Sequence, residues 1–381
     1  MKKEKIKKNP FVFGKVVTDE DFINRKEERQ IITREIESST NIILYAPRRY
    51  GKTSLIMQVF NDLEKKHKNF CGLVVDFYNV NTKEKFLSLL INEYTKKSGL
   101  SFDKVLKMLK NILSGLSTSI TFDEFGNPKA EIKLKPSENL LKAEEILQLP
   151  KRLADLGRLV CVFFDEFQEI KNLNGIEFQK ELRAAIQYHN NVSYIFSGSK
   201  FHMFNDIFTQ QDSPLYNIGK TIKLDKIKEI SYRRIILNRL KKVHHNVRTE
   251  HAIQIYNRVD GIPYYVQMLS HEIYNLAILN PDTEMQTLID QASENIIASK
   301  NDEFLIIYEN LSLAAKRILD VLIKENSQKI FSKETLSLHQ LPIATVQRAL
   351  RTLIEKGVIG KEKNRYYVQD VFLKQWLKMK L

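Results

Sequence analysis

Cysteine is almost absent from this 381-residue chain: only Cys71 and Cys161 occur, each beside or within an apolar run. Two cysteines exclude a disulfide scaffold and a cysteine-based zinc cluster, and they favour a reducing compartment. No apolar stretch approaches the roughly 20 residues that a transmembrane helix needs. The lysine-rich start, Met1 to Pro10, lacks the apolar segment that would make it a secretory signal. These absences predict a cytoplasmic protein that does not enter a membrane.

Acidic residues are too few to balance the basic ones, and the formal net charge is +14. Residues 1–8 carry +4 and residues 311–381 carry +8, so the rest of the chain carries only +2. Basic ends aid solubility, but a basic C-terminal segment is also what an anionic partner requires, and both interpretations stay open. With 43% hydrophobic and 28% charged residues, the composition is that of a globular protein of two or three domains.

Short apolar segments alternate with longer helical patterns between about residues 40 and 224, as in an α/β fold with a parallel sheet. Their Val, Ile, Leu, Phe and Tyr content predicts strands buried on both faces. The predicted strands are Asn41–Tyr45, Cys71–Tyr78, Leu159–Phe164, Val192–Ser197 and Lys220–Leu224. At about 100–150, two alternating runs around a Gly-Asn turn predict an inserted β-hairpin. We therefore expect an α/β core over residues 1–225.

The pattern from Ile227 to about Glu309 is helical. A single break, Gly261-Ile262-Pro263, begins a new helix, because proline suits an early helical position. We expect a helical domain over residues 226–310.

The pattern changes again after residue 310. Helices are predicted at Ala314–Glu325, after Ser332 and at Pro342–Lys356, followed by two short strands around the charged tip 361–365. Three helices and a two-stranded wing are typical of a winged helix-turn-helix, which we expect over residues 311–381.

The strongest motif is Ala46-Pro47-Arg48-Arg49-Tyr50-Gly51-Lys52-Thr53, which fits the P-loop pattern G-x-x-x-x-G-K-[ST] with alanine in place of the first glycine. A predicted strand precedes it and a predicted helix, Ser54–Leu63, follows. Backbone N–H groups of the segment from Ala46 to Ser54, in which only Pro47 lacks one, would surround phosphates at the positive end of that helix. Lys52 is expected to reach the β- and γ-phosphates, and the Thr53 hydroxyl to bind Mg²⁺.

Two acidic residues follow the apolar strand Leu159–Phe164. Asp165 would lie at the carboxyl end of that strand, where α/β proteins bind ligands, and would hold Mg²⁺. Glu166 would polarise the attacking water as a general base. The next strand ends in Ser197-Gly198-Ser199, and either hydroxyl could face the γ-phosphate. An ordinary serine–glycine turn explains that segment equally well when it is taken alone.

These features resemble the archaeal-type ATPases of the AAA+/STAND branch of P-loop NTPases, over nearly the whole chain. The resemblance implies ATP and Mg²⁺ as ligands, a helical lid over the adenine that reports nucleotide state, and Pro263 within that lid. Besides the P-loop, it rests on Asn9–Gly14, Phe22–Glu28, Asp165–Gln168, Leu182–Gln187, Phe196–Lys200, Ser213–Tyr216, Gly261–Pro263 and Asp370–Leu377.

The chain departs from that family pattern at two positions. Asn24 stands where many relatives have glycine, and Asn217 stands where an arginine is often found. Arg183, Lys200 and Lys220 could supply the missing positive charge, although a solvated surface charge explains each of them as well.

The function expected from the sequence is that of an ATP-binding, Mg²⁺-dependent ATPase with slow turnover, acting as a switch for its winged helix. The alternative is a DNA-binding regulator or protein-docking module in which nucleotide binding is structural and turnover is minor. The winged helix would bind DNA or an unidentified protein, and the protein could form a nucleotide-dependent oligomer. The basic residues expected to contact DNA are Arg348, Arg351, Lys356, Lys361, Lys363 and Arg365.

Overall fold

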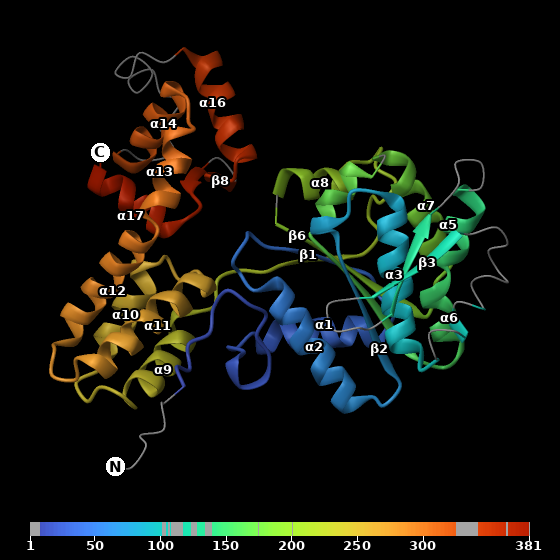
Figure 1. The fold of residues 1–381 in the computed structure, drawn as a ribbon, viewed down its shortest axis with the longest axis horizontal. Coiled ribbons are helices and arrows are strands. Elements are labelled where there is room, and N and C mark those ends of the chain that lie inside the picture. The colour runs from blue at the N-terminus through green and yellow to red at the C-terminus, as the bar shows by residue number, and fades with distance from the viewer. Residues whose placement is uncertain are drawn as a thin grey trace. The chain divides into compact units, whose positions relative to one another are not determined.

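A computed structural model describes residues 8–100, 104–105, 107, 117–122, 128–133, 139–173, 175–199, 201–324, 342–362 and 365–380. The chain divides into two compact units (Figure 1). Lys15–Lys226 form one, here called the sheet unit, and the residues up to Gly14 together with Ile227–Leu381 form the other, here called the helical unit. The predicted helical domain and winged helix therefore belong to a single unit.

A five-stranded parallel sheet is the centre of the sheet unit, as the sequence predicted, with the strand order β2-β5-β6-β1-β7. The strand bounds are β1 Ile42–Tyr45, β2 Phe70–Asp76, β5 Leu159–Asp165, β6 Val192–Gly198 and β7 Lys220–Lys223. Strand β2 ends earlier than predicted, because the chain turns into a short 3₁₀ segment, Phe77–Asn79, whose start is fixed by a hydrogen bond from Tyr78 N to Asp76 Oδ1. The sheet brings the carboxyl ends of β1, β5 and β6 together.

Alternate residues of each strand face opposite sides of this sheet, because side chains in a strand alternate in direction. Ile42 and Leu44 pack with helices α1 (Lys26–Glu37) and α2 (Lys52–Lys66), whereas Ile43 packs on the opposite face. That second face is covered by α3 Lys83–Ser98, α5 Asn139–Leu147, α6 Leu149–Asp155, α7 Ile176–Ile186 and α8 Phe201–Thr209. Both faces are buried, which explains the continuous apolar composition of the strands.

The predicted inserted hairpin is present as an antiparallel pair, β3 (Ser117–Phe122) and β4 (Pro128–Lys133). The Gly-Asn turn that was predicted to join them lies outside the described residues. Helices α5 and α6 follow, and Ile146 and Leu149 are fully buried in the main core. The inserted segment therefore ends before residue 150, because α5 and α6 already pack in the α/β core.

The helical unit contains α9 Glu229–Leu240, α10 Thr249–Arg258, α11 Pro263–Leu279, α12 Met285–Ser299, α13 Asn301–Glu309, α14 Leu313–Lys324, α16 Ile343–Glu355, β8 Ile359–Glu362, β9 Arg365–Val368 and α17 Val371–Lys380. Pro263 is the first residue of α11, as predicted. Strands β8 and β9 pair antiparallel and form the predicted wing. The helix predicted after Ser332 lies outside the described residues.

The C-terminal helix α17, for which the sequence pattern predicted no separate helix, joins the wing to the preceding helices. It packs against α12 and α13, and Trp376 Nε1 donates to Asn301 Oδ1 at 3.0 Å. Gln375 Nε2 donates to the Arg258 carbonyl at 2.9 Å. These contacts explain why the wing and the helices before it form one compact unit. No helix among the described residues has the length and apolar character needed to cross a membrane.

Candidate functional site

The P-loop connects β1 to α2 at the carboxyl edge of the sheet, where the sequence predicted it. Ala46 is fully buried, and its N–H donates to the Gly198 carbonyl at the end of β6, at 3.4 Å. Gly51 precedes the first residue of α2 with φ 81°, a left-handed conformation that favours glycine. The loop therefore presents the N-terminus of a 15-residue helix beside the ends of two central strands.

Lys52 is buried, with only 6% of its surface exposed, and its Nζ donates to the Ala46 carbonyl at 3.1 Å. Burial lowers the pKa of Lys52, while the negative charges of Glu166 and Asp165 oppose that shift. A buried ammonium group close to two carboxylates is suited to an anionic ligand, which would supply further compensating charge.

Asp165 is the centre of a hydrogen-bonded cluster that joins three segments of the chain. Thr53 Oγ1 donates to its Oδ2 at 2.5 Å, and Ser197 Oγ donates to its Oδ1 at 2.6 Å. The backbone N–H of Glu166 also donates to Oδ1, at 3.0 Å. Because β6 lies between β1 and β5, Ser197 reaches the acid from the central strand. The structure thus brings Thr53, Asp165 and Ser197 together.

Glu166 follows directly in a left-handed backbone conformation, φ 48° and ψ 41°, which non-glycine residues seldom adopt. Its Oε2 accepts hydrogen bonds from Gln168 Nε2 at 2.5 Å and from Ser199 Oγ at 2.6 Å. Ser197 and Ser199 therefore bind different carboxylates. Gln168 was not among the predicted site residues, although it ends the segment Asp165–Gln168 on which the family resemblance rests.

A third carboxylate, Asp76, lies at the end of β2, in register with Asp165 of β5. Partial loss of hydration raises the pKa of Asp76, and the negative charges of Asp165 and Glu166 raise it further. Among the described residues, no group of three or more His, Cys, Asp or Glu side chains is arranged to hold a metal ion.

The segment that precedes α1 forms hydrogen bonds with the P-loop and with the first turn of α2. Val17 N–H donates to Ser54 Oγ at 3.1 Å. Arg25, of which only 4% is exposed, donates from Nη2 to the Tyr50 carbonyl at 3.0 Å. Asn24 has φ 57°, so the position where many relatives have glycine requires a left-handed backbone, which asparagine tolerates better than most residues. The anchoring role of Arg25 was not predicted.

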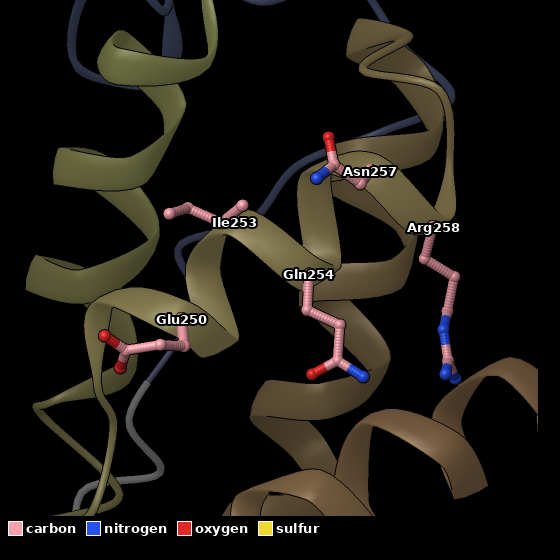
Figure 2. Close-up of a pocket in the computed structure, with 5 residues that line it drawn as sticks. All are labelled: Glu250, Ile253, Gln254, Asn257 and Arg258. Carbon is pink, nitrogen blue, oxygen red and sulfur yellow. The ribbon is translucent and has the colours of Figure 1, made fainter.

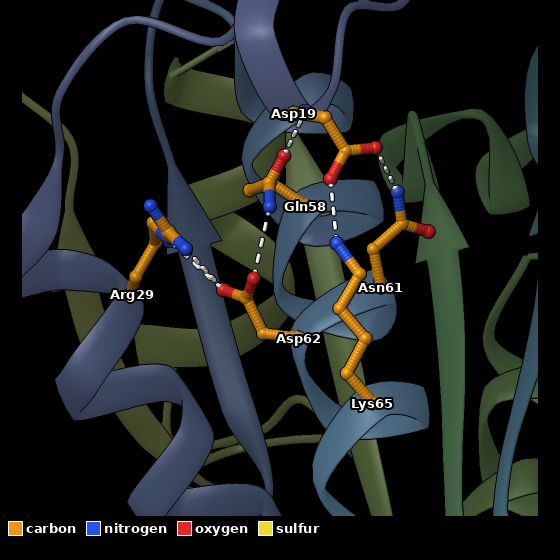
Figure 3. A network of polar contacts seen from close by, with 6 residues as sticks. All are labelled: Asp19, Arg29, Gln58, Asn61, Asp62 and Lys65. Atoms are coloured by element: carbon orange, nitrogen blue, oxygen red, sulfur yellow. Dashed lines mark hydrogen bonds and ion pairs between the residues drawn. The ribbon is translucent and has the colours of Figure 1, made fainter.

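A network of polar contacts continues this support along α2 (Figure 3). Asp62 accepts from Arg29 Nε at 2.9 Å and from Gln58 Nε2 at 2.9 Å, and Gln58 Oε1 accepts from Asp19 N–H at 2.5 Å. Lys65 forms an ion pair with Asp19 at 2.7 Å. The middle and last turns of α2 are therefore tied to α1 and to the segment that precedes α1.

Two of the residues proposed to replace a missing arginine lie away from the P-loop. Lys220 is the first residue of β7, beside Ile42 at the amino end of β1, and it pairs with Glu35 at 2.5 Å. Arg183 is in the last turn of α7, and a helix that follows a parallel strand ends near the amino edge of the sheet. Lys200 lies outside the described residues. Asn217 is exposed and has φ 50°, a conformation that asparagine tolerates better than arginine.

The basic residues predicted to bind DNA have different environments in the winged helix. Arg348 and Arg351 are exposed on α16. Lys356 donates to the Asn310 carbonyl at 3.1 Å, and the Lys361 ammonium lies over the Tyr366 ring, 5.3 Å from its centre. Arg365 is exposed at the start of β9, and Lys363 lies outside the described residues.

A shallow hollow occurs on one side of α10, lined by Glu250, Ile253, Gln254, Asn257 and Arg258 (Figure 2). Arg258 forms an ion pair with Asp290 at 2.5 Å, so its charge is already compensated. The hollow contains no cluster of catalytic side chains and is separate from the residues that the sequence predicted.

Residues 22–269 match the family described as "ATPase domain predominantly from Archaea", and residues 302–379 match the family described as "Probable winged helix domain". The fold therefore defines the class of protein: a P-loop α/β core followed by a winged helix. Because the first match covers more than half of the chain, the chain belongs to this archaeal-type ATPase family, as the resemblance in the sequence implied.

Curated relatives come from the archaeon Methanocaldococcus jannaschii. One uncharacterized protein is 23% identical over 367 residues, which cover 92% of this chain and 67% of that protein. Two uncharacterized ATP-binding proteins are 25% and 26% identical, over 40% of this chain and over 42% and 39% of their own lengths. The shared part of the latter two is therefore less than half of each protein.

Solved structures show the same fold at low identity. The Walker-type ATPase of Pyrococcus abyssi has a TM-score of 0.66 and 18% identity, with 97% of this chain and 99% of that chain covered. The ORC2 protein of Aeropyrum pernix, in its ADPNP–ADP complexes, has a TM-score of 0.54 and 15% identity, with 95% and 97% covered. These similarities concern the fold, which extends through both units.

Proposed function

We propose that the protein hydrolyses ATP with Mg²⁺ and that its nucleotide state acts as a switch for the winged helix. The observation that carries this proposal is the contact of Thr53, in the first turn of α2, with Asp165 at the end of β5, followed directly by Glu166. A hydroxyl and a carboxylate meeting at a helix N-terminus, with a second acid beside them, provide what phosphoryl transfer to water requires.

Each predicted site residue has a role in this proposal. The backbone of Ala46-Pro47-Arg48-Arg49-Tyr50-Gly51 and of Lys52-Thr53-Ser54 surrounds the phosphates, and Lys52 Nζ leaves the Ala46 carbonyl for the β- and γ-phosphates. Glu166 accepts a proton from the attacking water. Ser197 and Ser199, at the end of β6, lie between the P-loop and the acids and sense the γ-phosphate. Pro263 contributes to the lid over the adenine.

Mg²⁺ fits the donors that are present. Thr53 Oγ1 and Asp165 Oδ2 are hard oxygen donors of the kind Mg²⁺ prefers, and they lie 2.5 Å apart. The metal, when bound, would neutralise charge on the β- and γ-phosphates. Lys52 and the N-terminus of α2 would contribute the remaining positive potential.

Coupling to the winged helix is supported by contacts within the helical unit. Arg258 of α10 binds Asp290 of α12 at 2.5 Å and Ser293 Oγ at 3.2 Å, and its carbonyl accepts from Gln375 of α17. A movement of the lid helices would therefore carry α17 and the wing with it, because these polar contacts and the packing of Trp376 join them.

Two variants test the ATPase proposal. Lys52→Ala should abolish the thermal stabilisation by Mg-ATP, because a bound ligand stabilises by mass action and the main phosphate-binding charge is lost. Glu166→Gln should still be stabilised by Mg-ATP but should release phosphate roughly 10²–10⁴-fold more slowly, since Gln cannot accept the proton. Stabilisation of Lys52→Ala equal to that of wild type would exclude this site as the nucleotide site.

A second candidate function is that of a DNA-binding regulator in which turnover is minor. The supporting observation is that Arg348 and Arg351 are exposed on α16, at the position of a recognition helix. A structure of the Aeropyrum pernix ORC1 protein in complex with DNA shares the fold, with a TM-score of 0.50 at 15% identity. The two functions differ in one measurable respect. If hydrolysis drives the switch, Glu166→Gln should change the affinity of the winged helix for its partner. If the nucleotide is structural, that affinity should stay unchanged.

A further inference from the structure

Three groups form a closed hydrogen-bonded ring beside the nucleotide site. Gln168 Nε2 and Ser199 Oγ donate to the same oxygen, Glu166 Oε2, at 2.5 and 2.6 Å. The backbone N–H of Ser199 donates to Gln168 Oε1 at 3.3 Å. Each member contacts the other two, so the side chain of Glu166 is joined to the residue that follows β6.

Gln168 is fully buried, with 0% of its surface exposed. A buried amide costs free energy of folding unless both its ends are hydrogen-bonded, and here each end has a partner within the ring. An apolar residue would fill the same space without that requirement. The glutamine therefore has its specific effect through Glu166 and Ser199.

The two carboxylate oxygens of Glu166 differ in their hydrogen bonding. Oε2 accepts both side-chain hydrogen bonds, whereas no residue in the described parts of the chain donates to Oε1. Glu166 as a whole residue is half-buried. The left-handed backbone at Glu166 and the two hydrogen bonds to Oε2 both restrain this side chain.

We propose that Gln168 is a positioning residue for the hydrolytic reaction, with Ser199 as its partner, and this inference rests on the proposed ATPase function. By holding Oε2, they aim Oε1 at the attacking water. A proton passes from that water to Oε1, the water oxygen forms a bond to the γ-phosphorus, and the bond from the γ-phosphorus to its bridging oxygen breaks and releases ADP. Because Gln168 also holds the Ser199 backbone, the end of β6 and the base move together.

The test measures kcat and KM for Mg-ATP in Gln168→Leu and Ser199→Ala, each made in wild type and in Glu166→Gln. Gln168→Leu should lower kcat by about 10- to 100-fold with KM unchanged within about 3-fold, as expected for a misaligned base. In the Glu166→Gln background the same change should alter kcat by less than about 3-fold, because the effect passes through Glu166. A residue with a merely structural role would lower activity in both backgrounds.

Gln179→Leu is the matched control, because Gln179 is also buried in the sheet unit, 5% exposed, and forms no hydrogen bond with the ring among the contacts of the described residues. It should keep the wild-type kcat. Ser199→Ala should lose rate in the wild-type background and change kcat by less than about 3-fold in the Glu166→Gln background, whereas a direct contact of Ser199 with the γ-phosphate would lose rate in both. This comparison of Ser199→Ala in the two backgrounds keeps the test decisive if Gln168→Leu does not fold.

The outcomes separate this inference from the proposed function. An active wild type, an impaired Glu166→Gln and an unimpaired Gln168→Leu would overturn the positioning role alone. Equal losses from Gln168→Leu in both backgrounds would also overturn it. A wild type that does not hydrolyse ATP, or a Glu166→Gln variant at the wild-type rate, would overturn the proposed function and this inference with it.

Discussion

Replacing Arg25 by methionine tests whether the segment before α1 holds the P-loop. The guanidinium is 4% exposed and donates to the Tyr50 carbonyl and to Glu28 Oε1, both at 3.0 Å. Methionine retains most of the apolar stem, so the change removes the polar contacts of the guanidinium, including these two hydrogen bonds. Hydrogen bonds of charged groups contribute about 1.5–3 kcal/mol each. The side chain of Glu28 is 29% exposed and can be rehydrated, so we expect a total loss of about 2–3 kcal/mol.

Arg29→Met, four residues further on and within α1, is the matched comparison. Arg29 pairs with Asp62 at 2.5 Å, but the two side chains are 33% and 30% exposed, and pairs near the surface contribute about 0–1 kcal/mol. Urea unfolding followed by far-UV circular dichroism would give both free energies. The thermal shift with Mg-ATP would report separately on the P-loop and should fall more in Arg25→Met. If Arg25→Met costs no more than Arg29→Met, Arg25 does not anchor the loop.

Three further predictions concern other parts of the molecule. A Cβ on Gly198 would lie 2.1 Å from the Phe204 ring, so Gly198→Ala should lower the free energy of unfolding by about 1–3 kcal/mol in urea titrations. Burial lowers the pKa of His189 to about 4, below the value of about 6.5 in an unfolded chain, so its contribution to stability is complete above about pH 6.5 and is lost as the pH falls toward 4. His189→Gln should show a weaker decline over that interval, and an unchanged pH profile would contradict the assignment. DNA binding by the winged helix should weaken with salt at a log–log slope of about −0.9 per phosphate contact, and Arg348→Ala with Arg351→Ala should reduce that slope by about 2 in a fluorescence anisotropy titration.

Much of the fold was predictable because its signals are local. Five apolar segments gave the five sheet strands within a few residues, and Pro263 begins α11 where the break in the pattern indicated. The predicted buried positions of Phe163, Phe164 and Phe196 are confirmed by exposures of 0%, 1% and 0%. The end of β2 was predicted too late because the hydrogen bond to Asp76 Oδ1 turns an aromatic segment that has a strand-like composition.

Candidate site residues could be predicted where a single short motif contains both the residue and the strand or helix that positions it. The P-loop and the acid pair lie in short segments, and the neighbouring strand or helix can be inferred from the same segment. The ring of Glu166, Gln168 and Ser199 could not be predicted in this way. It joins residues 33 positions apart, and the contact exists only because β5 and β6 are adjacent in the sheet.

The amino-acid sequence by itself determined the α/β class, the approximate positions of the five sheet strands and the P-loop sequence motif, because apolar patterns and backbone requirements act over a few residues. The tertiary structure alone decided which polar groups meet. The strand order brought Ser197 into hydrogen-bonding contact with Asp165 and Ser199 into contact with Glu166. The parallel register of β7 with β1 placed Lys220 at the amino end of the strands, whereas the P-loop lies at their carboxyl end. It also brought Arg25 to the Tyr50 carbonyl. Such contacts depend on how distant segments pack, and no local pattern in the chain encodes that packing.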